Sequence, residues 1–85
     1  MSKIVTIYGD KGCVWCDRAK DLCKTYGITY EYKMIRDEGV FEELQSKVPG
    51  VKTVPQIFWF GKHIGGYAEL TIEIEETRNY GDGKI

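Results

Sequence analysis

Residues 4–16 read IVTIYGDKGCVWC. The first part belongs to a β-branched, nearly all-apolar segment, Lys3–Tyr8, which is typical of a central strand that is covered on both faces. The two glycines within residues 9–12 then break the strand. Beyond them the apolar spacing predicts a helix over Val14–Tyr26, and Gly27 stands where a glycine commonly ends a helix. The sequence therefore predicts a strand, a short glycine loop and a helix, with two cysteines at the junction.

The remaining sequence predicts five further elements, separated by short connections. They are a one-sided strand over residues 28–34, a helix over Glu38–Lys47 that Asp37 can cap, strands over Gln56–Phe60 and residues 63–65 joined by a Gly61-Lys62 turn, and a helix over Glu69–Tyr80. The last segment also fits a strand, because Leu70, Ile72 and Ile74 alternate with polar residues. A helix is favoured, since the segment is Glu-rich and lacks Gly and Pro, with Leu70, Ile74 and Thr77 as its stripe. We expect residues 81–85 to form a frayed tail.

The order of these elements, β-α-β-α-β-β-α, indicates the fold class. Two strands joined through a helix pair in parallel with a right-handed crossover, and the hairpin adds two antiparallel strands. We therefore expect an α/β fold, a four-stranded mixed sheet with helices on both faces. A chain of 85 residues leaves no room for a second domain, so residues 1–85 are expected to form one domain.

Composition and charge narrow the function classes. At 42% hydrophobic residues the chain is too apolar for disorder, and no apolar run approaches the roughly 18 residues of a membrane span. A net charge of −1 argues against nucleic-acid binding, which needs a basic excess. Residues 1–36 hold seven Lys and Arg against four Asp and Glu, which indicates either an anionic ligand or ordinary surface variation. The N-terminus lacks a signal-peptide pattern, so a cytoplasmic location is expected. The chain is also expected to be a monomer.

The motif Cys13-Val14-Trp15-Cys16 carries the candidate chemistry. The start of a helix offers free backbone N–H groups and the positive end of the helix dipole, which stabilise a thiolate. Cysteines in this setting have pKa values of about 3.5–7.5, against about 8.5 for a free thiol. Cys13 is therefore the predicted nucleophile, with Lys11 adding positive charge beside it. Cys16, one turn inward, is the predicted resolving thiol.

The other potential ligands favour redox chemistry over a zinc site. Half of a zinc site is the main alternative for a C-x-x-C motif, but tetrahedral zinc needs four ligands. Only Cys23 and His63 remain, and they do not form a pair, so no metal is expected. Cys23 lies about 10 Å beyond Cys16 along the helix, too far for a disulfide, and is predicted to be a small buried hydrophobe. His63 is predicted to be a solvated strand residue without chemistry.

Three motifs together resemble the glutaredoxins, the small dithiol members of the thioredoxin-fold group. They are the cysteine pair at residues 13–16, Thr53-Val54-Pro55-Gln56 and Gly65-Gly66, in this order and at these separations. The resemblance runs from about Lys3 to Leu70 and, by length, is to short bacterial or phage-type members. It implies a thioredoxin/glutaredoxin fold in which the Val54–Pro55 bond is cis instead of trans. The backbone of Val54 would then lie beside Cys13, where an extended peptide thiol can pair with it.

The resemblance also implies a groove that holds glutathione. By position its residues are Lys11, Trp15, Thr53, Val54, Pro55, Gly66 and Tyr67. Lys11 would meet a carboxylate, Gly66 would permit close backbone approach, and Trp15 would cover the ligand unless it belongs to the apolar stripe of its helix. Tyr67-Ala68 departs from the Cys-Asp of many relatives and removes a carboxylate that helps to bind the γ-glutamyl end. A helix N-terminus could still bind the ligand's carboxylate there.

The activity that the resemblance implies is thiol–disulfide exchange, with glutathione as the reductant. The partners would be glutathione and disulfide-containing or glutathionylated proteins, and ribonucleotide reductase is one protein substrate that it suggests. Two alternatives stay open. Tyr67-Ala68 is compatible with a thioredoxin-like reductase served by a flavoprotein. The lost proline of the usual Cys-Pro-Tyr-Cys is compatible with a 2Fe–2S cluster held by Cys13 of two chains and two glutathione molecules.

Overall fold

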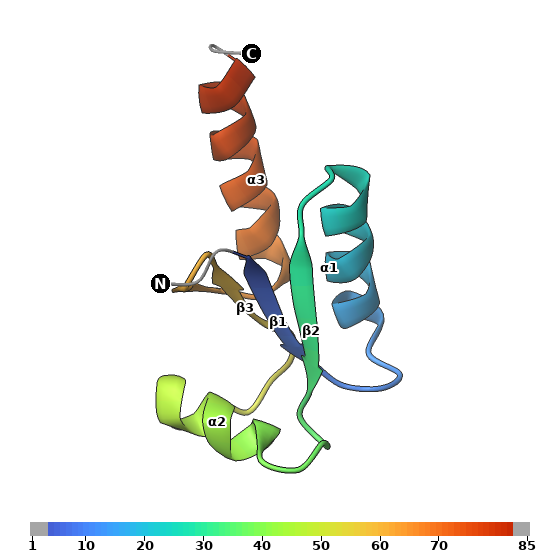
Figure 1. The fold of residues 1–85 in the computed structure, drawn as a ribbon, viewed down its shortest axis with the longest axis vertical. Coiled ribbons are helices and arrows are strands. Elements are labelled where there is room, and N and C mark those ends of the chain that lie inside the picture. The colour runs from blue at the N-terminus through green and yellow to red at the C-terminus, as the bar shows by residue number, and fades with distance from the viewer. Residues whose placement is uncertain (1–3, 83–85) are drawn as a thin grey trace.

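The computed structural model describes residues 4–82, with side chains through residue 77, and its elements follow the predicted order. They are β1 (Val5–Gly9), α1 (Val14–Thr25), β2 (Tyr30–Met34), α2 (Val40–Lys47), β3 (Gln56–Trp59), β4 (Lys62–Gly65) and α3 (Tyr67–Asp82). Figure 1 shows α1 and α3 side by side, with α2 apart from them at the lower end of the view. The expected α/β fold is confirmed.

The four strands form one mixed sheet in the order β2-β1-β3-β4. β1 is parallel to β2, and β3 is antiparallel to both β1 and β4. This is the predicted arrangement, because a helical connection gives parallel neighbours and a hairpin gives antiparallel ones. In the β1–β3 pair, Tyr8 lies opposite Gln56. The segment that follows β1 and the segment that precedes β3 therefore leave the sheet at the same end, where the candidate site lies.

Two hydrophobic clusters cover the two faces of the sheet. The larger holds the buried residues Val5, Ile7, Ala19, Cys23, Ile57, Leu70 and Ile74. The smaller holds Tyr8, Leu44 and Phe58. Successive strand residues point to opposite faces, so Ile7 and Tyr8 place the clusters on different sides of β1. Helices α1 and α3 thus share one face, α2 covers the other, and the prediction that β1 is buried on both faces is confirmed.

Tyr8 connects α2 to the sheet. Its side chain is 1% exposed and packs edge-on against Phe58, with ring centroids 5.6 Å apart. The hydroxyl donates to the Glu43 carboxylate of α2, and Lys33 Nζ on β2 lies 2.8 Å from the same oxygen. Burial, followed by the Glu43 contact, raises the pKa of Tyr8, while the hydrogen bonds from Lys33 and Tyr8 lower the pKa of Glu43. At neutral pH the phenol is thus the donor and the carboxylate the acceptor.

The buried face of α3 shows the spacing of a helix. Leu70 and Ile74 are 0% and 3% exposed, whereas Ile72 between them is 56% exposed. Since strand residues two apart would share a face, the strand alternative for this segment is excluded. Thr77, the third residue of the predicted stripe, is exposed, so that part of the prediction is wrong. Within residues 4–82, no helix is both long and apolar enough to cross a membrane.

Both ends of α3 lie beyond the predicted ones. The helix begins at Tyr67 instead of Glu69, because the Glu69 carboxylate reaches back and accepts from the N–H of Gly66 at 2.9 Å. The acidic residue thus stands inside the first turn and not at its start. Residues 81 and 82 are helical, which corrects the tail predicted over residues 81–85. Residues 83–85 lie outside the described residues.

The start of α2 also differs from the prediction. The helix begins at Val40 instead of Glu38, and its N-cap residue is Gly39, at φ 82° and without a side-chain cap. Asp37 was expected to cap with its carboxylate, but its backbone carbonyl accepts from Val40 N at 3.1 Å instead. The preceding residues form a turn, and Asp37 lies two positions before the N-cap residue.

The hairpin turns one residue earlier than predicted. Its two central residues are Phe60 and Gly61, not Gly61 and Lys62, and Trp59 pairs with Lys62 on either side of them. Phe60 and Gly61 have φ values of 50° and 97°. A type I′ hairpin turn requires positive φ at both central positions, which explains why β3 ends at Trp59 and not at Phe60.

Replacing Ile74 with alanine should lower the free energy of unfolding by about 2–5 kcal/mol, because the change leaves a cavity in the larger cluster. The matched substitution Ile72→Ala, on the exposed side of the same helix, should change it by less than about 0.5 kcal/mol. Urea unfolding followed by circular dichroism measures both. Equal losses would contradict the orientation of α3.

Candidate active site

The loop between β1 and α1 is held in place by β2 and the residues after it. The Tyr32 hydroxyl donates to the backbone carbonyl of Asp10 at 3.0 Å, and its ring lies where a Cβ on Gly9 would clash. The Asp10 carboxylate accepts from Arg36 Nε at 2.7 Å and from the backbone N–H of Lys11 at 2.8 Å. These two bonds, that from Arg36 first, lower the pKa of Asp10. The loop is therefore fixed at its backbone before it reaches the cysteines.

Cys13 is the N-cap residue of α1, as predicted from its place at the junction. Gly12 before it has φ 76°, a left-handed conformation that favours glycine. Cys13 itself is extended, and its Sγ accepts from the N–H of Cys16 at 3.1 Å, as the oxygen of a Ser or Asp cap would. A backbone N–H at the positive end of a helix is thus directed at this sulfur. Both effects favour a thiolate over a thiol.

The two cysteines of the motif differ in access. They form a disulfide with a Cα separation of 5.2 Å. Cys16 is 0% exposed, whereas Cys13 is partly exposed, and its Sγ lies 4.0 Å from the backbone oxygen of Val54. A substrate can therefore reach Cys13 first, and Cys16 is placed to react with a sulfur that is already bound to Cys13. This arrangement supports the predicted roles of nucleophile and resolving thiol.

The residues before β3 form the other side of the site. The Val54–Pro55 bond is cis, as the family resemblance implied. Pro55 is buried and Val54 is half-buried. The backbone oxygen of Val54 faces Cys13 at this end of the sheet. Since β1 and β3 are antiparallel neighbours, residues about forty positions apart in the sequence meet here.

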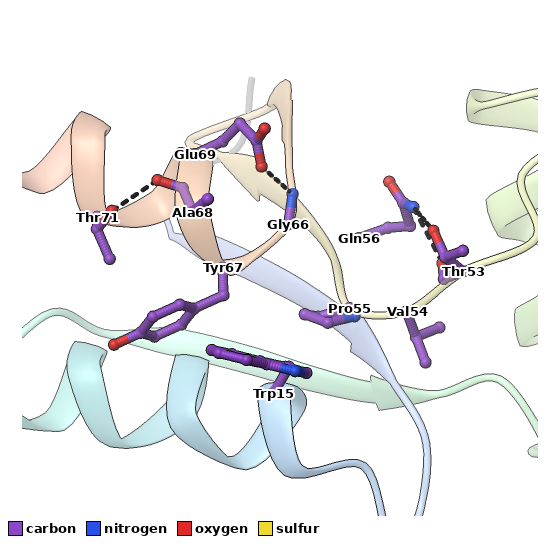
Figure 2. A pocket seen from close by; sticks show the side chains of 10 residues that line it. All are labelled: Trp15, Thr53, Val54, Pro55, Gln56, Gly66, Tyr67, Ala68, Glu69 and Thr71. Carbon is purple, nitrogen blue, oxygen red and sulfur yellow. Dashed lines mark hydrogen bonds between the residues drawn. The ribbon is translucent and has the colours of Figure 1, made fainter.

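A groove of about 640 Å³ opens beside the cysteine motif, between α1, the cis-proline segment and the start of α3. Figure 2 shows its side chains, with Trp15 and Tyr67 on one side and Pro55 and Val54 beside them. Its lining includes six of the predicted groove residues, namely Trp15, Thr53, Val54, Pro55, Gly66 and Tyr67. The structure thus brings together segments that lie far apart in the sequence. Lys11, the seventh, is exposed on the loop before Cys13 and is not part of this lining.

Trp15 lies at the groove and not in the apolar stripe of its helix. It is 52% exposed, while Cys16, Ala19 and Cys23 form the buried face of α1. Its ring packs against Tyr67 of α3, with centroids 5.4 Å apart, and the Arg18 guanidinium lies 4.8 Å from its centroid. These contacts hold a large aromatic ring next to the cysteines. Of the two sequence interpretations of Trp15, the structure supports the groove.

Four lining residues were not predicted from the sequence: Gln56, Ala68, Glu69 and Thr71. Glu69 is the most informative of them, because it places a carboxylate at the end of the groove where Tyr67-Ala68 had removed one. The hydrogen bond from Gly66 N lowers the pKa of Glu69. The signal for this role was an acidic residue three positions after a glycine that starts a helix.

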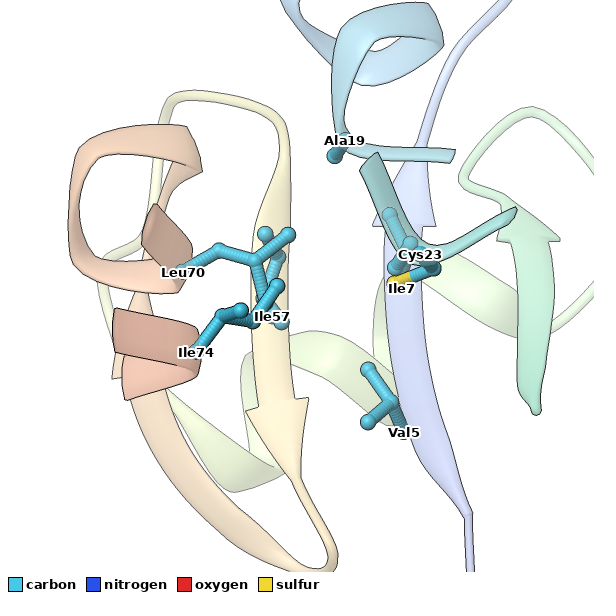
Figure 3. Packing of buried hydrophobic residues seen from close by; sticks show 7 residues of the cluster. All are labelled: Val5, Ile7, Ala19, Cys23, Ile57, Leu70 and Ile74. Atoms are coloured by element: carbon cyan, nitrogen blue, oxygen red, sulfur yellow. The ribbon is translucent and has the colours of Figure 1, made fainter. Parts of the chain in front are cut away.

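Cys23 does not take part in the site. Figure 3 shows its sulfur within the larger cluster, close to Ile7. It is a free cysteine with 0% exposure, and burial raises the pKa of its thiol to about 11. The predicted small buried hydrophobe is confirmed. Within the part of the chain that the structure describes, no three His, Cys, Asp or Glu side chains gather where they could hold a metal ion.

Known proteins resemble this chain in both sequence and structure. A sequence model of the Glutaredoxin family matches residues 5–64. Glutaredoxin 1 of Escherichia coli strain K12 is 43% identical over 78 residues, which cover 84% of this chain and 92% of that protein. The solved structure of reduced Escherichia coli glutaredoxin has a TM-score of 0.74 and 40% identity, covering 88% and 96% of the two chains. The crystal structure of a buckwheat glutaredoxin–glutathione complex has a TM-score of 0.71 and 26% identity, and the match covers 87% of this chain and 70% of that one.

Substitution of Glu69 with glutamine should reduce stability at neutral pH and flatten its dependence on acid. A carboxylate whose pKa is lowered by folding adds stability above its ordinary pKa of 4.5, and this contribution is lost as the pH falls through the folded-state value. The stability difference between wild type and variant should therefore shrink between pH 5 and pH 3. Thermal unfolding across this range measures it, with exposed Glu76→Gln as the control. A constant difference would contradict the Gly66 contact.

Proposed function

The chain belongs to the glutaredoxin family and is a thiol–disulfide oxidoreductase, and from this premise we propose that glutathione is its reductant. Its proposed substrates are protein disulfides and glutathione mixed disulfides. The observation that carries the proposal is the N–H of Cys16 directed at Cys13 Sγ, beside a groove whose volume suits a tripeptide.

The reaction begins at Cys13. Its thiolate attacks one sulfur of the substrate disulfide and forms a new S–S bond to it. The substrate's own S–S bond breaks, and the second sulfur leaves as a thiolate that takes up a proton. The substrate lies extended along the backbone of Val54, whose oxygen is 4.0 Å from Cys13 Sγ.

Two routes complete the reaction. With a protein disulfide, Cys16 loses its proton and attacks Cys13 Sγ, which closes the intramolecular disulfide and releases the second substrate thiol. One glutathione thiolate then opens that disulfide, and a second attacks the resulting adduct on Cys13. One disulfide and two glutathione molecules thus become two thiols and one glutathione disulfide. With a glutathionylated substrate, Cys13 takes the glutathione moiety and the protein leaves as a thiol. One free glutathione thiolate then attacks the adduct on Cys13 and leaves as glutathione disulfide, so Cys16 is not needed.

The charges and shape of the groove support glutathione as the ligand. Trp15 lies in the first turn of α1 and Tyr67 begins α3, so two positive helix ends meet at the groove. Glutathione carries two carboxylates that such ends attract and one ammonium group that Glu69 can pair with. Gly66 lines the groove and has no side chain to cover its backbone, so the ligand can approach that backbone closely. The buckwheat relative was solved with glutathione.

The surface around Cys13 supports protein substrates. Val14 and Trp15, within the cysteine motif, are 59% and 52% exposed, and exposed aromatic side chains such as Trp15 are enriched where proteins bind one another. We place the enzyme in the cytoplasm, where a reducing pool of glutathione is present. The family resemblance supports ribonucleotide reductase as one protein substrate, and reduction of that oxidised enzyme tests this assignment directly.

Exchange of each cysteine for serine should separate the two roles. Cys13→Ser should reduce turnover of a small glutathione mixed disulfide to the uncatalysed rate, because the nucleophile is lost. Cys16→Ser should retain most of this activity but lose reduction of a protein disulfide. Initial rates on both substrates measure the split, with the buried Cys23→Ser as the control. Equal loss in the two variants on the small substrate would contradict the roles.

A coupled assay tests the reductant. Wild-type enzyme should turn over a mixed disulfide with glutathione and glutathione reductase, and the rate should be at least about tenfold lower when thioredoxin reductase replaces both. The oxidation of NADPH reports each rate. Faster turnover with thioredoxin reductase and no glutathione would favour a thioredoxin-like reductase and overturn glutathione dependence.

A further inference from the structure

A chain of hydrogen bonds behind the groove joins β4 to the segment that carries the cis-proline. His63 Nε2 on β4 lies 2.8 Å from Gln56 Oε1. Gln56 Nε2 lies 3.0 Å from the backbone oxygen of Thr53 and 3.1 Å from its Oγ1, as Figure 2 shows. Gln56 is 9% exposed, so its amide is held by protein groups and not by bulk water.

The chemistry of these groups fixes the direction of the chain. A backbone carbonyl only accepts, so Gln56 presents its NH₂ group to Thr53 and its oxygen to His63. That oxygen also only accepts, and His63 must therefore donate from Nε2. The neutral Nε2–H tautomer and the imidazolium both carry this hydrogen, so the bond persists whether or not the ring is protonated. The charged residues near the ring, namely Lys62, Glu69 and Glu73, thus do not decide whether it forms.

The chain ends next to the reacting sulfur. Thr53 precedes Val54, whose oxygen is 4.0 Å from Cys13 Sγ, and Gln56 follows Pro55. One amide therefore fastens both ends of the Val54–Pro55 unit. We propose that His63 is a positioning residue for thiol–disulfide exchange, which acts through Gln56 to hold the backbone against which the substrate disulfide lies. The proposal rests on the proposed function and gives a role to a histidine that the sequence left without one.

Two substitutions at His63 separate donation from packing. The imidazole packs against the Phe58 ring at a tilt of 43°, with ring centroids 5.0 Å apart. His63→Phe keeps an aromatic ring there but removes the donor, so the Gln56 amide is free to turn and release Thr53. His63→Gln keeps an N–H donor at nearly the reach of Nε2. Because His63 is on the exposed side of an edge strand, both variants are expected to fold.

The test measures kcat and KM for a small glutathione mixed disulfide. For His63→Phe we expect KM to rise about three- to tenfold, the equivalent of one lost hydrogen bond, with kcat changed less than about twofold. His63→Gln should stay within about twofold of wild type in both constants. The rate of Cys13 alkylation should be the same in all three proteins, because the nucleophile and its N–H are untouched. Unchanged KM in His63→Phe, or equal loss in both variants, would overturn the proposal.

A second measurement stands apart from activity. The backbone amide NMR signals of Thr53 and Val54 should shift in His63→Phe and stay in place in His63→Gln. If wild type fails to turn over the mixed disulfide, the proposed function fails, while these shifts still decide whether His63 positions the loop. Signals that do not move in His63→Phe would overturn the positioning role even in a fully active enzyme.

Discussion

A single backbone N–H, that of Cys16, is directed at Cys13 Sγ, and much of the fold serves to keep it there. The first turn of a helix frays easily when nothing packs against it. Here the buried side chains of Ala19 and Cys23 pack α1 against the sheet. The Tyr32 hydroxyl holds the loop before α1 through its hydrogen bond to the Asp10 carbonyl. The reactivity of one sulfur is therefore a product of tertiary packing as well as of local sequence.

The groove follows from topology in the same way. Because β1 and β3 are antiparallel neighbours, the exit of one and the entry of the other lie at the same end of the sheet. Helices α1 and α3 pack on one face, and the first turns of both line the groove. A C-x-x-C motif alone supplies two sulfurs. The strand order adds the Val54 backbone, the aromatic pair of Trp15 and Tyr67, and a binding surface.

The sequence could predict those features that follow from a local residue pattern or from the family resemblance. The junction that places Cys13 and Cys16, the parallel and antiparallel pairings and the cis bond at Pro55 were all predictable in this way. Side chains whose roles depend on distant partners were not. The role of Gln56 depends on its hydrogen bonds to Thr53 and His63, which the sequence does not show. The role of Glu69 depends on its hydrogen bond to Gly66, at the start of a helix that begins earlier than the sequence predicted. Likewise, no residue type marks the positive φ of Phe60.

The seclusion of Cys23 has a practical consequence. A thiol-specific dye added to the folded, reduced protein meets one accessible sulfur, on Cys13, because Cys16 and Cys23 are both fully buried. Burial also raises the pKa of the Cys23 thiol, which disfavours the reactive thiolate. The third sulfur becomes visible only when α1 separates from the sheet. Reaction of the dye with Cys23 therefore reports the separation of α1 from the sheet, without any engineered label.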